Sequence, residues 1–130
     1  MSRTVHFEIQ ASKPQQLIDY YGSLLGWTFN KWEGGEYWLI NTGPDTQRGI
    51  NGGLLPRRGP APAANDAAPV NAFVNTIDVS DLDSMLAKAT SLGGSVCAQK
   101  MAVAGVGWLA YIKDPDGNIF GMLQPDAKAK

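Results

Sequence analysis

The sequence predicts an α+β fold made of two tandem βαβββ modules that form a curved mixed sheet around a cleft. Strand-like and helix-like segments follow one another in the same order twice, at a shift of about 68 residues, which indicates a duplicated unit. A segment rich in Pro and Ala separates the two copies. With 130 residues the chain fits one domain, divided into module 1 (about 3–56), a linker (57–69) and module 2 (70–125).

The first module opens with a strand and a helix. Apolar and polar residues alternate strictly in "VHFEIQA" (5–11), which places His6 and Glu8 on the face opposite Phe7 and Ile9. Apolar residues then recur at helical spacing from Pro14, which is tolerated in a first helical turn, to Gly26, a typical C-terminal cap.

Three more strands complete the first module. The segments "WTFNKW" (27–32) and "YWLINT" (37–42) flank the turn "EGGE" and predict a hairpin. The segment "RGINGGLL" (48–55) predicts a shorter strand that its glycines weaken. The order of module 1 is therefore βαβββ.

The second module repeats the first. A shift of 68 residues pairs Ile9 with Ile77, Ser12 with Ser80 and Gly26 with Gly94, and after a small slip in the loops "NIFGMLQP" aligns with "GINGGLLP". That alignment pairs Trp38 with Trp108 and Gly52 with Gly121. Gly121 follows the turn "DPDG" and lies inside a predicted strand, where a glycine costs conformational entropy and packs nothing. A bulge or twist without any ligand would also explain the two glycines.

Composition excludes several classes of partner. Lys and Arg (11) nearly balance Asp and Glu (12), so neither nucleic acid nor an acidic membrane surface is expected to bind through charge. No apolar run approaches the length of a membrane span, and no leader-like segment opens the chain. A single cysteine, Cys97, rules out an intramolecular disulfide. These features predict a cytoplasmic protein.

Three segments in order resemble the vicinal oxygen chelate superfamily, which holds glyoxalase I, the bleomycin resistance proteins and the extradiol dioxygenases. They are "HFEIQASKPQQLIDYYGSLLGW", "VSDLDSMLAKATSLGGSV" and "DPDGNIFGMLQ". In the metal-using members, side chains at the start of the first strand and near the middle of the last strand of each module bind one divalent ion. The resemblance carries these positions onto His6, Val74, Gly52 and Gly121, and it implies a homodimer.

Of these four positions only His6 offers a side-chain donor, whereas such ions need about three. We therefore predict no metal and no cofactor, unless Glu8, Thr76 or Asp78 build an unfamiliar site. His6 and Glu8 lie two residues apart on one strand face, so they could bind one small molecule or be joined through a water. Trp38 and Trp108 offer flat surfaces to a ligand, although both could equally pack in the core.

Two functions are consistent with this pattern. The first is a metal-free binding protein that sequesters or senses a small, partly aromatic ligand in the cleft between the modules. Its predicted ligand-binding residues are His6, Glu8, Trp38, Gly52, Val74, Trp108 and Gly121. The second is a glyoxalase-like lyase or isomerase, with a displaced metal site or with His6 or Glu8 as a general base. The sequence identifies neither the ligand nor a catalytic residue.

Overall fold

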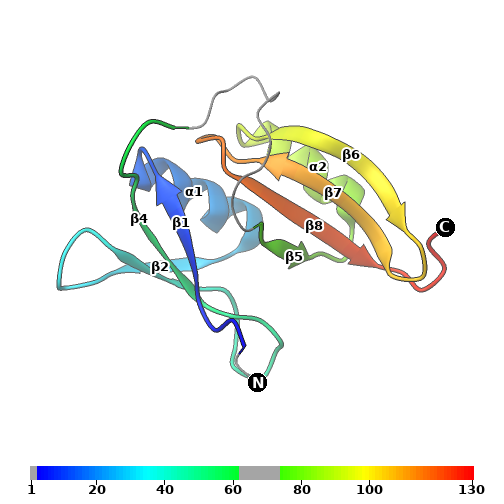
Figure 1. Cartoon of the computed structure of the whole chain (residues 1–130), viewed down its shortest axis with the longest axis horizontal. Coiled ribbons are helices and arrows are strands. Elements are labelled where there is room, and N and C mark those ends of the chain that lie inside the picture. Colours follow the sequence, from blue (N-terminus) through cyan, green and yellow to red (C-terminus); the bar gives the residue numbers. More distant parts are fainter. Residues whose placement is uncertain (1–2, 62–73) are drawn as a thin grey trace. The chain divides into compact units, whose positions relative to one another are not determined.

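A computed structural model describes residues 3–61 and 74–130 of the chain (Figure 1). Contacts within the chain define two compact units, residues 1–61 and 62–130, and each is described by itself. The predicted linker is described only as far as Ala61. Its residues 62–69, and the first residues of the predicted strand that follows, lie outside the described part.

Module 1 contains one helix and a mixed four-stranded sheet. Its elements are β1 (Phe7–Ala11), α1 (Pro14–Leu25), β2 (Thr28–Lys31), β3 (Trp38–Asn41) and β4 (Gly52–Pro56). The strand order is β1-β4-β3-β2, in which β1 runs parallel to β4 and the other neighbours are antiparallel.

Module 2 has the same topology. Its elements are β5 (Thr76–Asp78), α2 (Leu82–Ser91), β6 (Ser95–Val103), β7 (Gly107–Lys113) and β8 (Ile119–Pro125). The strand order β5-β8-β7-β6 repeats that of the first sheet, again with one parallel pair, β5 and β8. The predicted α+β fold with two βαβββ modules is confirmed, and each module has its own four-stranded sheet.

The ends of the helices follow from their sequences. Pro14 occupies the first turn of α1, and Gly26 ends that helix in the left-handed conformation (φ 73°), its N–H donating to the Gly22 carbonyl at 3.0 Å. The second helix begins differently, because the Asp81 carboxylate accepts a hydrogen bond from the Ser84 N–H at 3.1 Å. Neither helix, nor any other in the described residues, is long and apolar enough to span a membrane.

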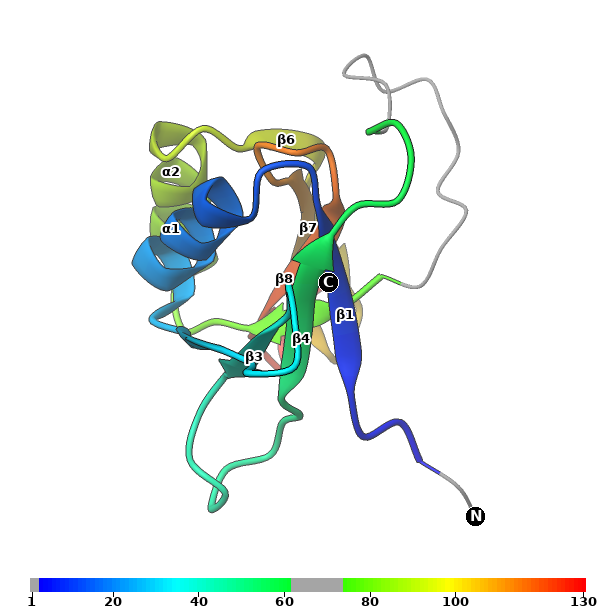
Figure 2. The same ribbon diagram turned by 90° about the vertical axis from the view of Figure 1, so that its left-hand side faces the viewer.

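Each helix covers one face of the sheet of its own module (Figure 2). In the described part of module 1 the buried hydrophobic residues are Ile9, Ala11, Leu17, Tyr20, Tyr21, Leu24, Ile40 and Leu54. In module 2 they include Leu82, Ala89, Ala110, Ile112, Phe120 and Met122. The sheet face opposite the helix, which we call the open face, carries no helix of its own module.

The strand register decides which residues reach the open face of module 1. Glu8 and Leu39 are both cross-strand partners of Gly53, so these three residues share that face. Gly52 pairs with Phe7 and therefore faces α1, as does every second residue along the strand.

The register also corrects the predicted pairing of the repeats. Glu8 pairs with Gly53 as Thr76 pairs with Gly121, so a constant shift makes Gly53, not Gly52, the counterpart of Gly121. The slip assumed in the loops moves the alignment by one residue, which in a strand reverses the face.

The predicted pairing of Trp38 with Trp108 is wrong for the same reason. Trp38 pairs with Leu54 and Ala110 with Met122, so the position equivalent to Trp38 is Ala110. The two tryptophans lie on strands of the same kind but differ by two residues along them. They therefore do not form a symmetric pair.

Candidate functional site

The open face of module 1 holds a continuous chain of three polar side chains. The hydroxyl of Tyr37 lies 2.8 Å from Nε2 of His6 and donates to Oε2 of Glu8 at 2.9 Å. The sequence suggested that His6 and Glu8 could be joined through a water; the phenol of Tyr37 joins them instead. All three residues come from β1 or from residues next to β1 and β3, so the sheet backbone fixes their spacing.

Tyr37 fits this place because residue 53 is a glycine. A Cβ at Gly53 would collide with the Tyr37 hydroxyl and ring, so the phenol lies directly on the strand backbone. On its other side the Tyr37 ring meets the indole of Trp32 edge to face, with centroids 6.5 Å apart. Trp32 is 54% exposed and belongs to the turn between β2 and β3.

Its surroundings keep the Tyr37 phenol protonated. Burial, the hydrogen bond to Glu8 and the negative charge of Glu8 together raise the pKa of Tyr37 to about 12. A phenol has one proton, and Tyr37 donates it to Glu8. Nε2 of His6 must therefore carry a proton to complete the chain, which in a neutral imidazole leaves Nδ1 as the acceptor.

This proton arrangement leaves two acceptors free. Nδ1 of His6 has no hydrogen-bond partner in residues 3–61 and 74–130, and within the same ranges neither has Oε1 of Glu8. Both side chains are exposed. The face can thus accept hydrogen bonds from a ligand, and it can accept a proton at the imidazole.

Two other residues that the sequence singled out in module 1 face α1. The ring and carbonyl of Phe7 cover Gly52, where a Cβ would stand 2.6 Å from that carbonyl oxygen. Trp38 shares its face with the fully buried Leu54, and the ammonium of Lys31 lies 5.8 Å from its ring centroid. Neither residue lies on the open face with His6 and Glu8.

In module 2 the predicted residues also divide between the faces. Gly121 lies on the open face, where a Cβ would stand 3.1 Å from Oγ1 of Thr76 and 3.2 Å from the Tyr111 ring. Trp108 lies on the α2 side, because the ammonium of Lys100, 5.2 Å from its ring centroid, also contacts Asp83 of that helix.

In module 2 the Asp126 carboxylate accepts two hydrogen bonds. The indole N–H of Trp108 donates to the Asp126 carboxylate at 3.1 Å. The backbone N–H of Lys128 and, to a lesser degree, this bond from Trp108 lower the pKa of Asp126. Val74, the predicted counterpart of His6, is half-buried just before β5 and offers no donor atom in its side chain.

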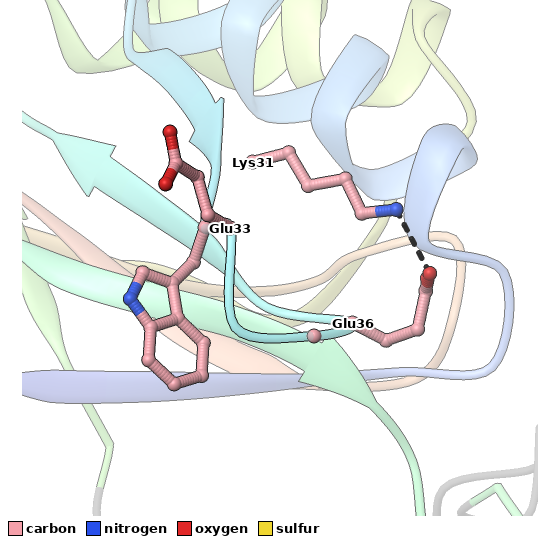
Figure 3. Close-up of a pocket in the computed structure, with 5 residues that line it drawn as sticks. Lys31, Glu33 and Glu36 are labelled. Carbon is pink, nitrogen blue, oxygen red and sulfur yellow. Dashed lines mark hydrogen bonds and ion pairs between the residues drawn. The ribbon is translucent and has the colours of Figure 1, made fainter.

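A shallow hollow of about 410 Å³ lies on the β2–β3 turn (Figure 3). It is lined by Lys31, Trp32, Glu33, Gly35 and Glu36, and the Lys31 ammonium contacts the Glu36 carboxylate at 2.9 Å. None of the predicted ligand-binding residues lines it. Trp32 connects it to the polar chain through the ring of Tyr37.

The residues present do not fit the divalent ion that the superfamily's metal enzymes hold. Of the four carried-over positions, His6 alone has a donor side chain, and replacing Gly52 by its register-corrected equivalent Gly53 adds none. No group of three or more His, Cys, Asp or Glu residues that could hold an ion occurs within the described ranges. His6 and Glu8 supply two donors, both already bonded to Tyr37.

Sequence reasoning missed Tyr37 and Gly53. A signal for Gly53 was available, because the shift that aligns Glu8 with Thr76 also aligns Gly53 with Gly121. Tyr37 had no comparable signal. Its role depends on reaching diagonally from the end of the hairpin over the glycine of a neighbouring strand, which no local pattern encodes.

Comparison with known proteins identifies the class. The family model described as "Glyoxalase-like domain" matches residues 6–123, so this chain belongs to the glyoxalase-like family of the vicinal oxygen chelate superfamily, as the resemblance predicted.

Among curated proteins, the chain is 31% identical over 121 residues to "Putative glyoxylase CFP32" of Mycobacterium bovis and of Mycobacterium tuberculosis. The match covers 91% of this chain but 42% of those proteins, so the chain spans less than half the length of the curated relatives it matches.

Solved structures share the fold at low identity. One is a fosfomycin resistance protein, FosX, from Listeria monocytogenes, complexed with Mn(II) and 1S,2S-dihydroxypropylphosphonic acid (TM-score 0.72, 11% identity, 97% of this chain and 92% of that one). Another is a glyoxalase/bleomycin resistance protein/dioxygenase family enzyme from Burkholderia phytofirmans PsJN (TM-score 0.65, 14% identity, 90% of this chain and 94% of that one). These likenesses bear on the fold alone.

Proposed function

We propose that this protein binds a small molecule on the open face of module 1 without a metal ion, and so sequesters or senses it. The chain His6–Tyr37–Glu8 carries the proposal. It gathers an imidazole, a phenol and a carboxylate at one exposed place on a rigid sheet, an arrangement typical of polar recognition groups in binding sites.

The free acceptors indicate which ligands suit this face. Nδ1 of His6 and Oε1 of Glu8 favour a ligand with N–H or O–H donors, or with a positive charge. Leu39, 49% exposed, and Trp32 add apolar and aromatic surface beside the polar chain. A small, partly aromatic molecule with hydrogen-bond donors fits this combination.

The remaining predicted ligand-binding residues stay predictions. They are Trp38, Gly52, Val74, Trp108 and Gly121. Of these, Trp38, Gly52 and Trp108 lie on the helix side of their sheets, which favours a packing role for them. The cleft between the modules likewise stays a prediction.

A fragment screen followed by amide NMR tests the proposal. We expect shift changes centred on residues 6–8, 37–39 and 53, and at least a tenfold loss of affinity in Tyr37→Phe, equivalent to about 1.4 kcal/mol. Tyr111→Phe, on the open face of module 2, is the matched control and should leave the affinity unchanged. Binding that is centred elsewhere, or that survives Tyr37→Phe intact, contradicts the proposal.

The same chain of hydrogen bonds favours a second function, a glyoxalase-like lyase or isomerase. His6 can take a proton at Nδ1 while Glu8 and Tyr37 hold its ring in place, as a general base requires. Turnover of α-dicarbonyl or α-hydroxycarbonyl compounds, followed by proton NMR, tests this function. Activity lost in both His6→Gln and Glu8→Gln, but kept in Tyr111→Phe, would favour catalysis over binding.

We further infer a cytoplasmic homodimer with no nucleic-acid or membrane partner. The near balance of positive and negative charges supports the absence of such partners. Members of the superfamily often pair modules across dimers, which supports the dimer. Sedimentation that gives a monomer at micromolar concentration would contradict the dimer.

A further inference from the structure

Side chains at positions 6, 8 and 53 on the open face of module 1 would all point toward the hydroxyl of Tyr37. His6 and Glu8 lie on the same face, two residues apart, and Gly53 is the cross-strand partner of Glu8. A Cβ on Gly53 would point at the phenol oxygen of Tyr37, the same atom that contacts Nε2 of His6 and Oε2 of Glu8. The Tyr37 hydroxyl therefore occupies the point where side chains from all three positions would meet.

A divalent metal ion bound by side chains at positions 6, 8 and 53 would have to occupy the place of the Tyr37 hydroxyl. An imidazole, a carboxylate and a third donor on neighbouring strands would make a three-ligand site with open positions, as in many metal centres. In this chain the third position is a glycine, and the phenol bonds to the other two donors. The Tyr37 hydroxyl donates its proton to Glu8 and therefore occupies this point as a hydrogen-bonding group.

We propose that Tyr37 is the specificity-determining residue of this face, because its phenol fills the space between positions 6, 8 and 53 and so excludes a divalent metal ion. Tyr37 and Gly53 act as a matched pair: the glycine admits the phenol, and the phenol replaces the ion as the centre of the site. The face consequently recognises ligands by hydrogen bonds rather than by chelation. The inference concerns the face itself and holds whether its ligand is bound or turned over.

The test introduces a metal-coordinating carboxylate at position 53 and removes the phenol of Tyr37. We would compare the wild type, Tyr37→Ala, Gly53→Glu and the double variant Tyr37→Ala with Gly53→Glu, using Co(II) absorption spectra and calorimetry with Ni(II) and Zn(II). We expect saturable one-to-one binding in the double variant alone. Adding His6→Ala to it should abolish that binding, because His6 supplies the imidazole.

Module 2 provides the matched control. Gly121→Glu places a carboxylate at the position equivalent to Gly53, and Tyr111→Ala removes the tyrosine ring that lies beside it, but Val74 and Thr76 offer no imidazole or carboxylate there. We expect no metal binding from this variant. Circular dichroism verifies that each variant is folded, and Gly53→Asp with Tyr37→Ala, a shorter donor, serves if the first double variant does not fold.

Two outcomes would overturn the inference. One is saturable Co(II) binding by the wild type that depends on His6 and Glu8. The other is a folded double variant, with either Glu or Asp at the rebuilt position, that binds no metal. Co(II) binding by the wild type would also contradict the metal-free part of the proposed function, whereas a double variant that binds no metal leaves it untouched. Ligand binding itself is decided separately by the fragment screen of the wild-type protein.

Discussion

The open faces of the two modules have the same strand register but carry different side chains. On each, a glycine of the last strand pairs with the first strand, as Gly53 pairs with Glu8 and Gly121 with Thr76. In module 1 a phenol covers the glycine and joins an imidazole to a carboxylate. In module 2 a threonine, a leucine and a tyrosine ring surround it. The duplicated register thus supplies the place, and the side chains around it determine the chemistry.

The helix-facing sides differ in another way. Module 1 has Gly52 beneath the ring of Phe7, and at the equivalent of Gly52 module 2 has Phe120, which is 5% exposed. The residue equivalent to Phe7 is Asn75. An aromatic ring therefore enters the same layer from the first strand in one module and from the last strand in the other.

Introducing the Phe120 arrangement of module 2 into module 1 should have the largest effect on the free energy of unfolding. Gly52→Phe alone should lower the free energy of unfolding by about 3 kcal/mol or more, because the new ring would overlap Phe7. Combining it with Phe7→Asn reproduces the pairing of module 2 and should recover about half of that loss. Urea unfolding measures Gly52→Phe, Phe7→Asn and the double variant. If the loss in free energy of unfolding of the double variant equals the sum of the losses of the two single variants, the two modules do not fill this layer equivalently.

The two open-face glycines should respond unequally to an added methyl group. Gly53→Ala should cost about 2 kcal/mol by displacing Tyr37, whereas the contacts of 3.1 Å and more around Gly121 should keep Gly121→Ala within about 1 kcal/mol. Thermal unfolding gives the comparison. In a Tyr37→Ala background the cost at Gly53 should largely disappear; if it persists, strand geometry rather than the phenol requires that glycine.

Removing single hydroxyl groups compares the two tyrosines. Tyr37→Phe should lower the free energy of unfolding by about 1 kcal/mol, because it breaks the link between His6 and Glu8. Tyr111→Phe should change it by less than about 0.5 kcal/mol. Chemical unfolding of the two variants distinguishes these values, and equal losses would mean that the polar chain of module 1 adds no stability.

Titration with base probes the electrostatics of module 1. The pKa of Tyr37 is raised to about 12 in the folded protein, against about 10 for an unperturbed tyrosine, so the folded state holds its proton longer than the unfolded state does. This contribution to stability should be fully present below about pH 10 and be lost as the pH rises towards 12. Tyrosinate absorbance should show a late-titrating component that is absent in Tyr37→Phe and shifted to lower pH in Glu8→Gln.

The smallest effects should come from two similar lysines. Lys31 lies over Trp38 and contacts Glu36, while Lys100 lies over Trp108 and contacts Asp83. The Lys31 side chain is 54% exposed and that of Lys100 33%, so water screens the first pair more. Lys31→Ala should cost less than about 0.5 kcal/mol and Lys100→Ala up to about 1 kcal/mol, measured by urea unfolding. A larger loss at Lys31 would reverse this order.

The fold was predictable because its signals are local. Alternation in β1, helical spacing in α1 and the turn before β8 each depend on a few neighbouring residues, and the repeat then orders them. The observed strands of module 1 begin and end within a few residues of the predicted ones, except that β4 begins at Gly52, after several residues of the predicted segment.

The candidate site was predictable in part. Alternation placed His6 and Glu8 on one face correctly, since that depends only on residues within β1. The face of Gly52 and the pairing of the tryptophans were misplaced, because cross-strand register depends on loop lengths that the aligned repeats do not share.

By itself, then, the sequence determined two copies of one βαβββ unit, the polar face of its first strand and a donor set too small for the superfamily's metal ion. The tertiary structure alone decided what lies at the centre of that face. It places the phenol of Tyr37 over Gly53, between His6 and Glu8, through contacts across three strands. Such contacts are set by register and by the space that a missing side chain leaves, and neither is written in the order of neighbouring residues.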